Sequence, residues 1–173
     1  MNTWLISDTH FYHENILNFK RSDGTALRVF NDIHHMNEIM IHNWNAVVGF
    51  EDKVYHLGDV AMSSFTRTKE IFDRLNGTKI LIKGNHDNLK LAQYQTMFKD
   101  IRAYNILDNI LLAHIPIHPD SLGRWKGQVH GHLHSFIVPD KRYFNVSVEQ
   151  INYTPINFNL VKNYFEKLTK SDT

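Results

Sequence analysis

The chain has 173 residues, of which 42% are hydrophobic and 21% are charged, and its formal net charge is +1 at pH 7. This is the composition of a globular protein that can bury its own core. The nearly balanced charge predicts no stable complex with nucleic acid. The absence of cysteine excludes disulfides, thiolate metal ligands and a cysteine nucleophile, whereas 12 histidines are many for this length.

The first residues and the hydropathy of the chain predict the cellular location of the protein. Asp8 places an acidic residue early, no basic leader precedes it, and no apolar run reaches the length of a membrane span. We therefore expect a cytoplasmic protein without a signal peptide or a membrane partner. No repeat, low-complexity tract or linker interrupts the sequence, which predicts a single domain over residues 1–173. The oligomeric state is left open.

Short apolar runs alternate with helix-length amphipathic segments along the chain. In chain order, the pattern predicts a strand at 3–7, a helix at 36–48, a strand at 53–57, a helix at 64–75, a strand at 79–83, a helix at 88–99, strands at 109–115 and 143–148, and a final helix at about 158–168. Ser63-Ser64 and Asp87-Asn88 are suited to cap the second and third helices. Strand–helix alternation followed by a strand-rich region predicts an α/β sandwich.

Four of the apolar runs end in an abrupt change to residues that can bind metals. The changes occur at Asp8-Thr9-His10, Gly58-Asp59, Gly84-Asn85-His86-Asp87 and His114. In sheets whose faces are covered by helices, the carboxyl ends of the strands form the ligand crevice. We therefore expect these groups to converge although they lie far apart in the sequence.

The motifs differ in how strongly they indicate a site. Short patterns such as Asp8-x-His10 and Gly58-Asp59 often arise by chance, and for each alone a turn or a helix cap is the favoured interpretation. The composition predicts a Gly-Asn-His-Asp run such as 84–87 only roughly 0.004 times in this chain, and the motif Gly131-His132-x-His134 roughly 0.04 times. Their occurrence together, mostly at strand ends, indicates one functional site.

This ordered set of motifs resembles the calcineurin-like metallophosphoesterase superfamily. The resemblance runs from about residue 3 to 156, and the segments WLISDTHFYHENI, HNWN and FNVSVE are similar to small bacterial and phage members without accessory domains. It implies a metallophosphoesterase-type four-layer α/β/β/α sandwich. The motif set is specific to the superfamily but does not identify a substrate.

The resemblance also implies two divalent metal ions as cofactors. Carboxylate, amide and imidazole ligands suit Mn, Fe, Zn or Ni, and they do not decide among these metals. By the resemblance, one ion is bound by Asp8, His10, Asp59 and His134, and the other by Asp59, Asn85, His114 and His132. Asp59 then bridges the pair, since a carboxylate offers two oxygens. The ligand set is complete without His130, which is interpreted as a strand-end residue beside the site.

The resemblance assigns the remaining chemistry to His86, which donates a proton to the leaving oxygen or stabilises charge on the phosphoryl group. Asp87 either orients His86 as its acidic partner or caps the following helix. Asn85 and His86 are also expected to contact substrate. His13 and Arg124 are weaker candidates for substrate contacts, and an ordinary exposed loop is the favoured interpretation of the segment around Arg124.

The function that follows from the resemblance is hydrolysis of phosphate esters by metal-bound hydroxide, with His86 assisting the leaving group. A phosphodiesterase acting on small or nucleotide-like substrates is favoured. A phosphomonoesterase or protein phosphatase is the first alternative. A catalytically silent binding scaffold with a phosphoesterase fold is the second, and the intact ligand set with His86 argues against it. The substrate and the native metal stay open.

Overall fold

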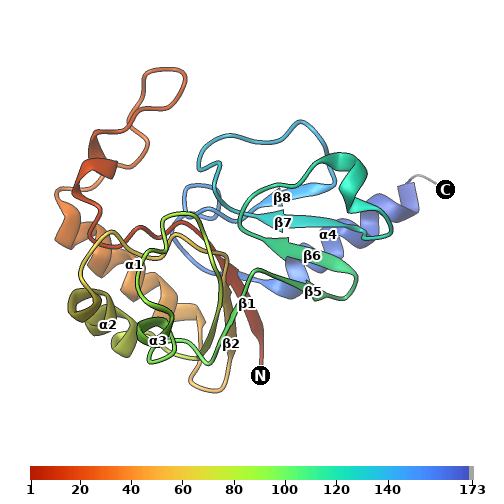
Figure 1. The fold of residues 1–173 in the computed structure, drawn as a ribbon. Helices are drawn as coiled ribbons and strands as arrows, with labels where there is room; N and C mark the ends of the chain where they lie inside the picture. The colour runs from red at the N-terminus through yellow and green to blue at the C-terminus, as the bar shows by residue number, and fades with distance from the viewer. Residues whose placement is uncertain (172–173) are drawn as a thin grey trace.

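The computed structural model describes residues 1–171 and shows a mixed α/β fold with two sheets (Figure 1). Its elements are β1 (Thr3–Ile6), the 3-10 helix η1 (Glu14–Asn18), α1 (Ile33–Val47), β2 (Lys53–His56), α2 (Phe65–Arg74), β3 (Thr78–Ile82), α3 (Leu91–Tyr94), β4 (Asp100–Arg102), β5 (Tyr104–Leu107), β6 (Ile110–Ala113), the 3-10 helix η2 (Pro119–Leu122), β7 (Gly127–His130), β8 (Tyr143–Asn145), β9 (Ile156–Asn157) and α4 (Phe158–Ser171).

The first sheet has five strands in the order β4-β3-β2-β1-β9. Strands β1 to β4 run parallel, with Thr3 opposite Lys53 and Lys53 opposite Thr78, and β9 is antiparallel to β1. Helices α1 and α2 provide the crossovers between neighbouring parallel strands. Because the strands are parallel, their carboxyl ends lie along one edge of the sheet.

The second sheet has four strands in the order β5-β6-β7-β8. A tight hairpin joins β5 to β6, and its two central residues, Asp108 and Asn109, both have positive φ (48° and 66°). This is the backbone of the hairpin turns that match the right-handed twist of strands. Strands β6, β7 and β8 are parallel, so the segments that follow them also leave the sheet at one edge.

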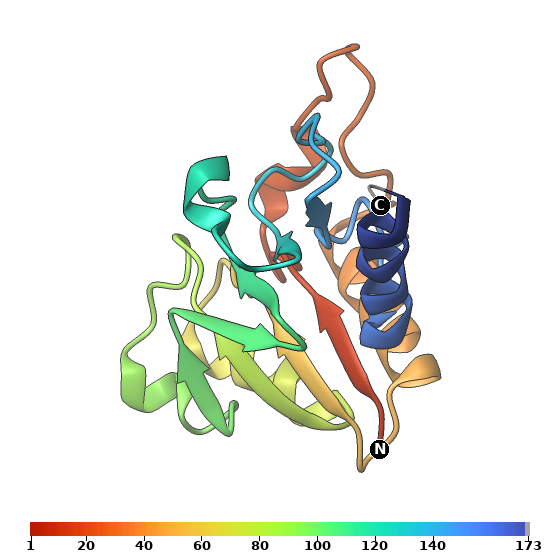
Figure 2. The same ribbon diagram turned by 90° about the vertical axis from the view of Figure 1, so that its right-hand side faces the viewer.

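Two buried clusters hold the layers together. In the first, Met40 and Trp44 of α1 and Phe72 of α2 pack against one face of the first sheet. In the second, the opposite face of that sheet packs against Leu112 of the second sheet and Phe165 of α4. Figures 1 and 2 show α1 and α2 on one side of the first sheet, and the second sheet and α4 on the other.

The sequence predicted most elements that carry a long apolar pattern. The strands expected at 3–7, 53–57, 79–83, 109–115 and 143–148 and the helices at 36–48, 64–75 and 158–168 are confirmed, with shifted ends. Ser64 is the N-cap of α2, as expected, and Asp32 caps α1 by accepting the N–H of His35. The short strands β4, β5 and β9 were not anticipated, and β7 was implied only by the strand-end position expected for His130.

The helix predicted at 88–99 is wrong for most of its length. Only Leu91–Tyr94 is helical, and its N-cap is Lys90, so Asp87-Asn88 does not cap it. Buried Tyr94, Met97 and Phe98 have helical spacing but pack into the core from a turn-rich segment. The N–H of Lys99 donates to the carbonyl of Lys79, which ends the turn and aligns the chain for β4. No helix within residues 1–171 is long and apolar enough to span a membrane.

Candidate metal centre

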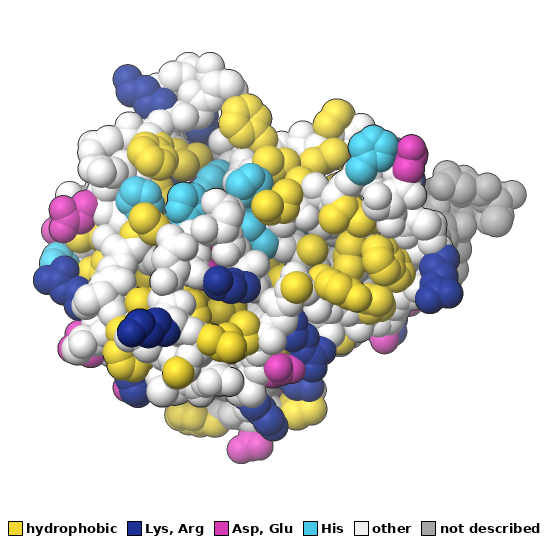
Figure 3. All heavy atoms as spheres, viewed as in Figure 1, with side chains coloured by type: hydrophobic (Ala, Val, Ile, Leu, Met, Phe, Trp, Pro, Cys, Tyr) yellow, Lys and Arg dark blue, Asp and Glu magenta, His cyan; other side chains and the backbone are white. Residues whose placement is uncertain are grey.

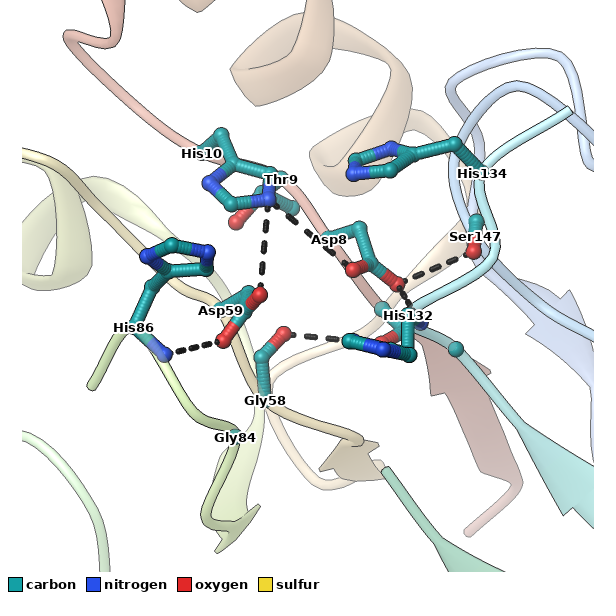
Figure 4. A network of polar contacts seen from close by, with 12 residues as sticks. Asp8, Thr9, His10, Gly58, Asp59, Gly84, His86, His132, His134 and Ser147 are labelled. Carbon is teal, nitrogen blue, oxygen red and sulfur yellow. Dashed lines mark hydrogen bonds and ion pairs between the residues drawn. The ribbon is translucent and has the colours of Figure 1, made fainter. Parts of the chain in front are cut away.

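The polar segments that follow the parallel strands meet at one place. Asp8 follows β1, Asp59 follows β2 and Asn85 follows β3 in the first sheet, whereas His114 follows β6 and His132 follows β7 in the second. Figure 4 shows the carboxylates of Asp8 and Asp59 pointing into the same space as the surrounding imidazoles. The expected convergence of the strand ends is therefore present.

Asp8, His10 and His134 form the first candidate cluster. Each offers one ligand atom, and these atoms all lie within 4.8 Å of one another. Nε2 of His10 is 3.9 Å from Oδ1 of Asp8, and the rings of His10 and His134 stack with centroids 5.2 Å apart. Three side chains from two sheets thus surround a volume suited to one cation.

Asp59, His114 and His132 form the second candidate cluster, with ligand atoms again within 4.8 Å of one another. Nε2 of His114 lies 3.4 Å from Oδ2 of Asp59 and 2.9 Å from Oδ1 of Asn85. The amide oxygen of Asn85, a predicted ligand, therefore lies beside this cluster.

Asp59 lies between the two clusters. Its Oδ2 is 3.6 Å from Nε2 of His10 and 3.4 Å from Nε2 of His114, which belong to different clusters. Its other oxygen, Oδ1, accepts the backbone N–H of His86 at 2.8 Å. The carboxylate is thus fixed with Oδ2 between histidines of the two clusters, so it could bridge two cations through this single oxygen, because Oδ1 is already hydrogen-bonded.

Buried atoms without partners test whether these residues fit metal ions. Oδ1 of Asp8 and both ring nitrogens of His10 are buried and have no hydrogen-bond partner in the part of the chain that the structure describes. A buried polar group left unsatisfied costs about 1–3 kcal/mol. Divalent cations bound by oxygen and nitrogen would satisfy Oδ1 of Asp8 and one nitrogen of His10, so the donor set fits the metals expected from the sequence.

The protonation states agree with this fit. Burial lowers the pKa of His10 well below its usual value, so its ring is neutral and free to coordinate. Burial opposes ionisation of Asp59, but the hydrogen bond and positive charge of His114 outweigh it and lower the Asp59 pKa to about 2. Burial likewise opposes protonation of His114, whose pKa is raised by Asp59 and Asp8.

Five of the seven predicted metal ligands have a backbone conformation that side chains rarely adopt. Positive φ values occur at Asp8 (58°), His10 (46°), Asp59 (56°), His132 (67°) and His134 (49°). Each such residue costs about 1–3 kcal/mol and persists only where the surrounding structure enforces it, most often at functional sites. No pattern in the sequence indicated this strain, and half of the ten described non-glycine residues with positive φ are predicted ligands.

Two motif glycines are explained by close contact with the carboxylates. A Cβ at Gly84 would overlap the side chain and backbone of Asp59, and one at Gly131 would overlap Ser7 and Asp8. The N–H of His132, the residue after Gly131, donates to Oδ2 of Asp8 at 2.9 Å. The glycines therefore allow the loops of the two sheets to touch the ligands.

A buried chain of charges behind the first cluster was not predicted. Arg28, only 2% exposed, donates from Nε to Oε1 of Glu149 at 2.7 Å and from its Nη atoms to the carbonyls of Asp8 and Thr9. The same Glu149 oxygen accepts from Nδ1 of His134 at 3.0 Å, which leaves Nε2 for the cluster. No spacing in the sequence pointed to Arg28, and Glu149 appeared only as the end of FNVSVE.

The structure brings His86 and His13 to the rim of the clusters. The ring of His86, which is exposed, lies 5.7 Å from that of His10, and the half-buried ring of His13 lies 5.5 Å from it. Both predicted positions are therefore close enough to face a ligand bound at the centre. His130 is buried outside both clusters, and its Nδ1 lies 2.7 Å from the carbonyl of Gly131, in agreement with its expected place beside the site.

Asp87 and Arg124 do not take the roles in the site that were considered for them. The carboxylate of Asp87 accepts the backbone N–H groups of Gly84, Asp59 and Val60 at 2.8–3.0 Å, so it holds two loops together and is not directed at His86. The carbonyl of Arg124 accepts from Asn109, which precedes β6, whereas His114 follows β6. Arg124 is thus at the opposite end of the strand and is not brought to the site.

Sequence comparison identifies relatives of this chain. No protein-family model matches it. It is 36% identical over 173 residues to the "Uncharacterized protein MJ1445" of Methanocaldococcus jannaschii, covering 95% of this chain and 91% of that protein. The chain belongs to the MJ1445 family. The Gene 66 protein of Mycobacterium phage D29 is a further relative, 28% identical over 79% of this chain and 80% of its own length.

Among solved structures, this member of the MJ1445 family is similar to the protein of unknown function AQ665 from Aquifex aeolicus. The TM-score is 0.73 at 28% identity, over 94% of this chain and 98% of that one. A weaker match to a Vps29 single mutant from Entamoeba histolytica has a TM-score of 0.43 at 18% identity, a level too low to support an argument. The names of the MJ1445 and AQ665 proteins assign no activity, so function rests on the geometry of the site.

Proposed function

We propose that this protein is a phosphoric ester hydrolase that depends on two divalent metal ions, of the calcineurin-like metallophosphoesterase type. The observation that carries the proposal is the position of Asp59 Oδ2, within 3.6 Å of His10 in one cluster and 3.4 Å of His114 in the other. Two metals about 3.5–4 Å apart with a shared ligand are typical of enzymes that hydrolyse phosphate esters. The layers follow the order α1 with α2, the first sheet, the second sheet and α4. This order supports a four-layer α/β/β/α sandwich of the metallophosphoesterase type.

The charge of the centre suits a phosphate group. Bound divalent cations polarise phosphoryl oxygens and lower the pKa of water towards neutrality. Asp8 and Asp59 together contribute two negative charges, fewer than the four positive charges of two divalent ions. The remaining positive charge would attract an anionic ester.

His86 is the candidate proton donor to the leaving oxygen. Its backbone N–H is fixed on Oδ1 of Asp59, while its ring stays exposed at the rim. An imidazole in that place can reach a substrate oxygen without coordinating, which is the position a general acid needs. His13 lies on the same rim and is a second candidate contact for the substrate. We assign Asp87 to holding the Asp59 loop.

A phosphodiesterase acting on small or nucleotide-like esters remains the favoured specificity. The surface beside the clusters carries apolar side chains as well as histidines (Figure 3). A phosphate that bears organic substituents fits such a surface better than a bare phosphate or a large phosphoprotein. The proposal includes a cytoplasmic location and no lasting complex with nucleic acid or membrane.

The test combines metal stoichiometry with hydrolysis. Metal-free protein is titrated separately with Mn²⁺, Ni²⁺ and Zn²⁺ by calorimetry, then assayed on an aryl phosphodiester, 2′,3′- and 3′,5′-cyclic nucleotides, an aryl phosphomonoester and a phosphopeptide. We expect two ions per chain and turnover of a diester with at least one metal. Asp59→Asn should bind one ion at most and lose activity. Two bound ions without hydrolysis of any ester would contradict the proposal and favour a silent scaffold.

A further inference from the structure

A cavity of about 560 Å³ adjoins the candidate metal centre. One wall comes from the segment that follows η1 and includes Phe19 and Lys20. The other wall comes from the loop after β7 and includes the two metal-binding residues His132 and His134 together with Phe136. Any group attached to a phosphate at the centre therefore has this cavity as an immediate neighbour.

Two aromatic side chains on these walls are exposed. Phe19 is 46% exposed and Phe136 is 60% exposed, which leaves large apolar surfaces beside a polar centre. The ring of Phe19 lies 5.5 Å from that of His13, whose ring lies 5.5 Å from that of His10. Phe19 is thus linked to the first cluster by two successive ring contacts.

Both walls are held in place by hydrogen bonds. The carbonyl of Phe19 accepts from the N–H of Leu27, and Lys20 pairs with Ala26 in an antiparallel bridge. On the other wall, the side chain of Asn145 donates to the carbonyls of His134 and Phe136, at 3.1 and 3.0 Å. The two aromatic rings are therefore presented by ordered backbone, which lowers the entropic cost of binding a ligand between the walls.

The polar groups of the cavity favour an anion with a polar, flat substituent. Among the described residues that line it, Lys20 and the histidines are the only ionisable ones, and none is acidic. Asn18 and Ser135 add hydrogen-bonding groups to the lining. An alkyl chain could use the aromatic rings but not these polar groups, whereas a nucleobase can use both.

We propose that this cavity is the binding site for the base of a nucleotide-type ester, with Phe19 and Phe136 as the residues that determine specificity. The inference rests on the proposed function for the position of the phosphate, and adds the chemical class of the organic group. Base–aromatic stacking is sequence-tolerant, so the site accepts purines and pyrimidines alike. Phe19 and Phe136 contact the substrate and take no part in metal binding.

The test measures binding, so that it does not depend on turnover. Protein loaded with Mn²⁺ is titrated by calorimetry with adenosine monophosphate, ribose 5-phosphate, hexyl phosphate and inorganic phosphate. We expect adenosine monophosphate to bind at least roughly tenfold more tightly than ribose 5-phosphate, as stacking of one base allows. Phe19→Ala and Phe136→Ala should each reduce this preference, and the double variant should abolish it, without a change in metal stoichiometry or phosphate binding.

Matched controls separate stacking from general effects. Phe50, which is 82% exposed at the turn before β2, provides Phe50→Ala as a substitution of the same kind away from the cavity, and it should leave every affinity unchanged. Phe19→Leu and Phe136→Leu keep the bulk and remove the ring, so they should behave like the alanine variants.

Two results would overturn the inference. One is equal affinity for adenosine monophosphate and ribose 5-phosphate in the unaltered protein. The other is hexyl phosphate binding as tightly as adenosine monophosphate, which would assign the cavity to an alkyl group. A base preference without hydrolysis would retain this inference and contradict the proposed hydrolase function. Hydrolysis without a base preference would retain the hydrolase function and contradict this inference.

Discussion

Oε1 of Glu149 lies 3.0 Å from Nδ1 of His134 and 2.7 Å from Nε of Arg28, so a single buried carboxylate oxygen joins a candidate metal ligand to a buried cation. Because a carboxylate only accepts, Nδ1 of His134 must carry the proton, and Nε2 is the nitrogen available to a metal. Arg28 extends the link to the backbone of Asp8. One connected group thus orients two members of the first cluster.

We predict that Glu149→Ala weakens both metal binding and folding. Loss of a hydrogen-bond partner behind a metal-binding histidine typically lowers metal affinity about 10–100-fold. It also leaves Arg28 buried without its partner, which costs about 3–5 kcal/mol in the free energy of unfolding. Calorimetric metal titration and chemical denaturation measure the two effects. Glu38→Ala, which removes the exposed partner of Arg74, should change stability by at most about 1 kcal/mol and should not alter metal affinity.

Gly131→Ala is expected to disturb the first cluster. The added Cβ would overlap the side chains of Ser7 and Asp8, so Asp8 must move from the position that faces His10 and His134. We expect fewer than two ions per chain, measured by elemental analysis after dialysis. Gly49→Ala is the matched control, because a Cβ at Gly49 would meet Asp52 at an ordinary contact distance of 3.5 Å. It should leave the number of bound ions unchanged. Unaltered stoichiometry in Gly131→Ala would show that the loop shifts without affecting the ligand.

Asp87→Asn distinguishes a structural role for Asp87 from a role in proton transfer. Its carboxylate accepts three backbone N–H groups, and an amide presents a donor to at least one of them. The free energy of unfolding should fall by about 1.5–3 kcal/mol, because hydrogen bonds to a charged group are lost. The pH dependence of kcat should keep its shape. A shifted acidic or basic limb in that profile would instead support Asp87 as the partner of His86.

His56 should make the stability of the metal-free protein depend on pH. Burial lowers its pKa from 6.5 to about 3, and its ring is hydrogen-bonded to Thr9 and Gly58. Between these pH values the unfolded chain binds a proton at His56 that the folded protein does not, so stability falls as pH falls from 6.5 towards 3. One proton corresponds to about 1.4 kcal/mol per pH unit.

The measurement is chemical denaturation in the presence of a chelator at several values between pH 6.5 and pH 4.5. His56→Gln should flatten the slope relative to the unaltered protein, whereas substitution of His42, exposed on α1, should not. Parallel slopes for the two variants would contradict the assignment of the pH dependence to His56.

The sequence predicted which side chains meet at the candidate site because chemistry and topology coincide there. Asp8, Asp59 and Asn85 each follow a strand with a strong apolar pattern, and parallel strands bring such positions together. Arg28 could not be predicted in this way, because its partners are backbone carbonyls and a glutamate 121 residues away in the sequence. Contacts of that kind depend on how loops pack, and no local pattern encodes them.

The misjudged helix at 88–99 has a similar origin. Tyr94, Met97 and Phe98 repeat with helical spacing, but pairing of β4 with β3 takes over at Asp100 and leaves room for a single helical turn. Because this turn begins at Leu91 and Lys90 is its N-cap, Asp87 does not cap it, and the Asp87 carboxylate instead accepts backbone N–H groups of neighbouring loops. Tertiary hydrogen bonds outweighed the local pattern at both positions.

Each candidate cluster draws its side chains from both sheets, since Asp8 and Asp59 follow strands of the first and His134, His114 and His132 follow strands of the second. Ions bound there would link the amino-terminal and carboxy-terminal halves of the polypeptide. The metal-bound protein would then resist proteolysis for longer than the metal-free protein. Its abundance in a cell would therefore depend on the supply of divalent cations.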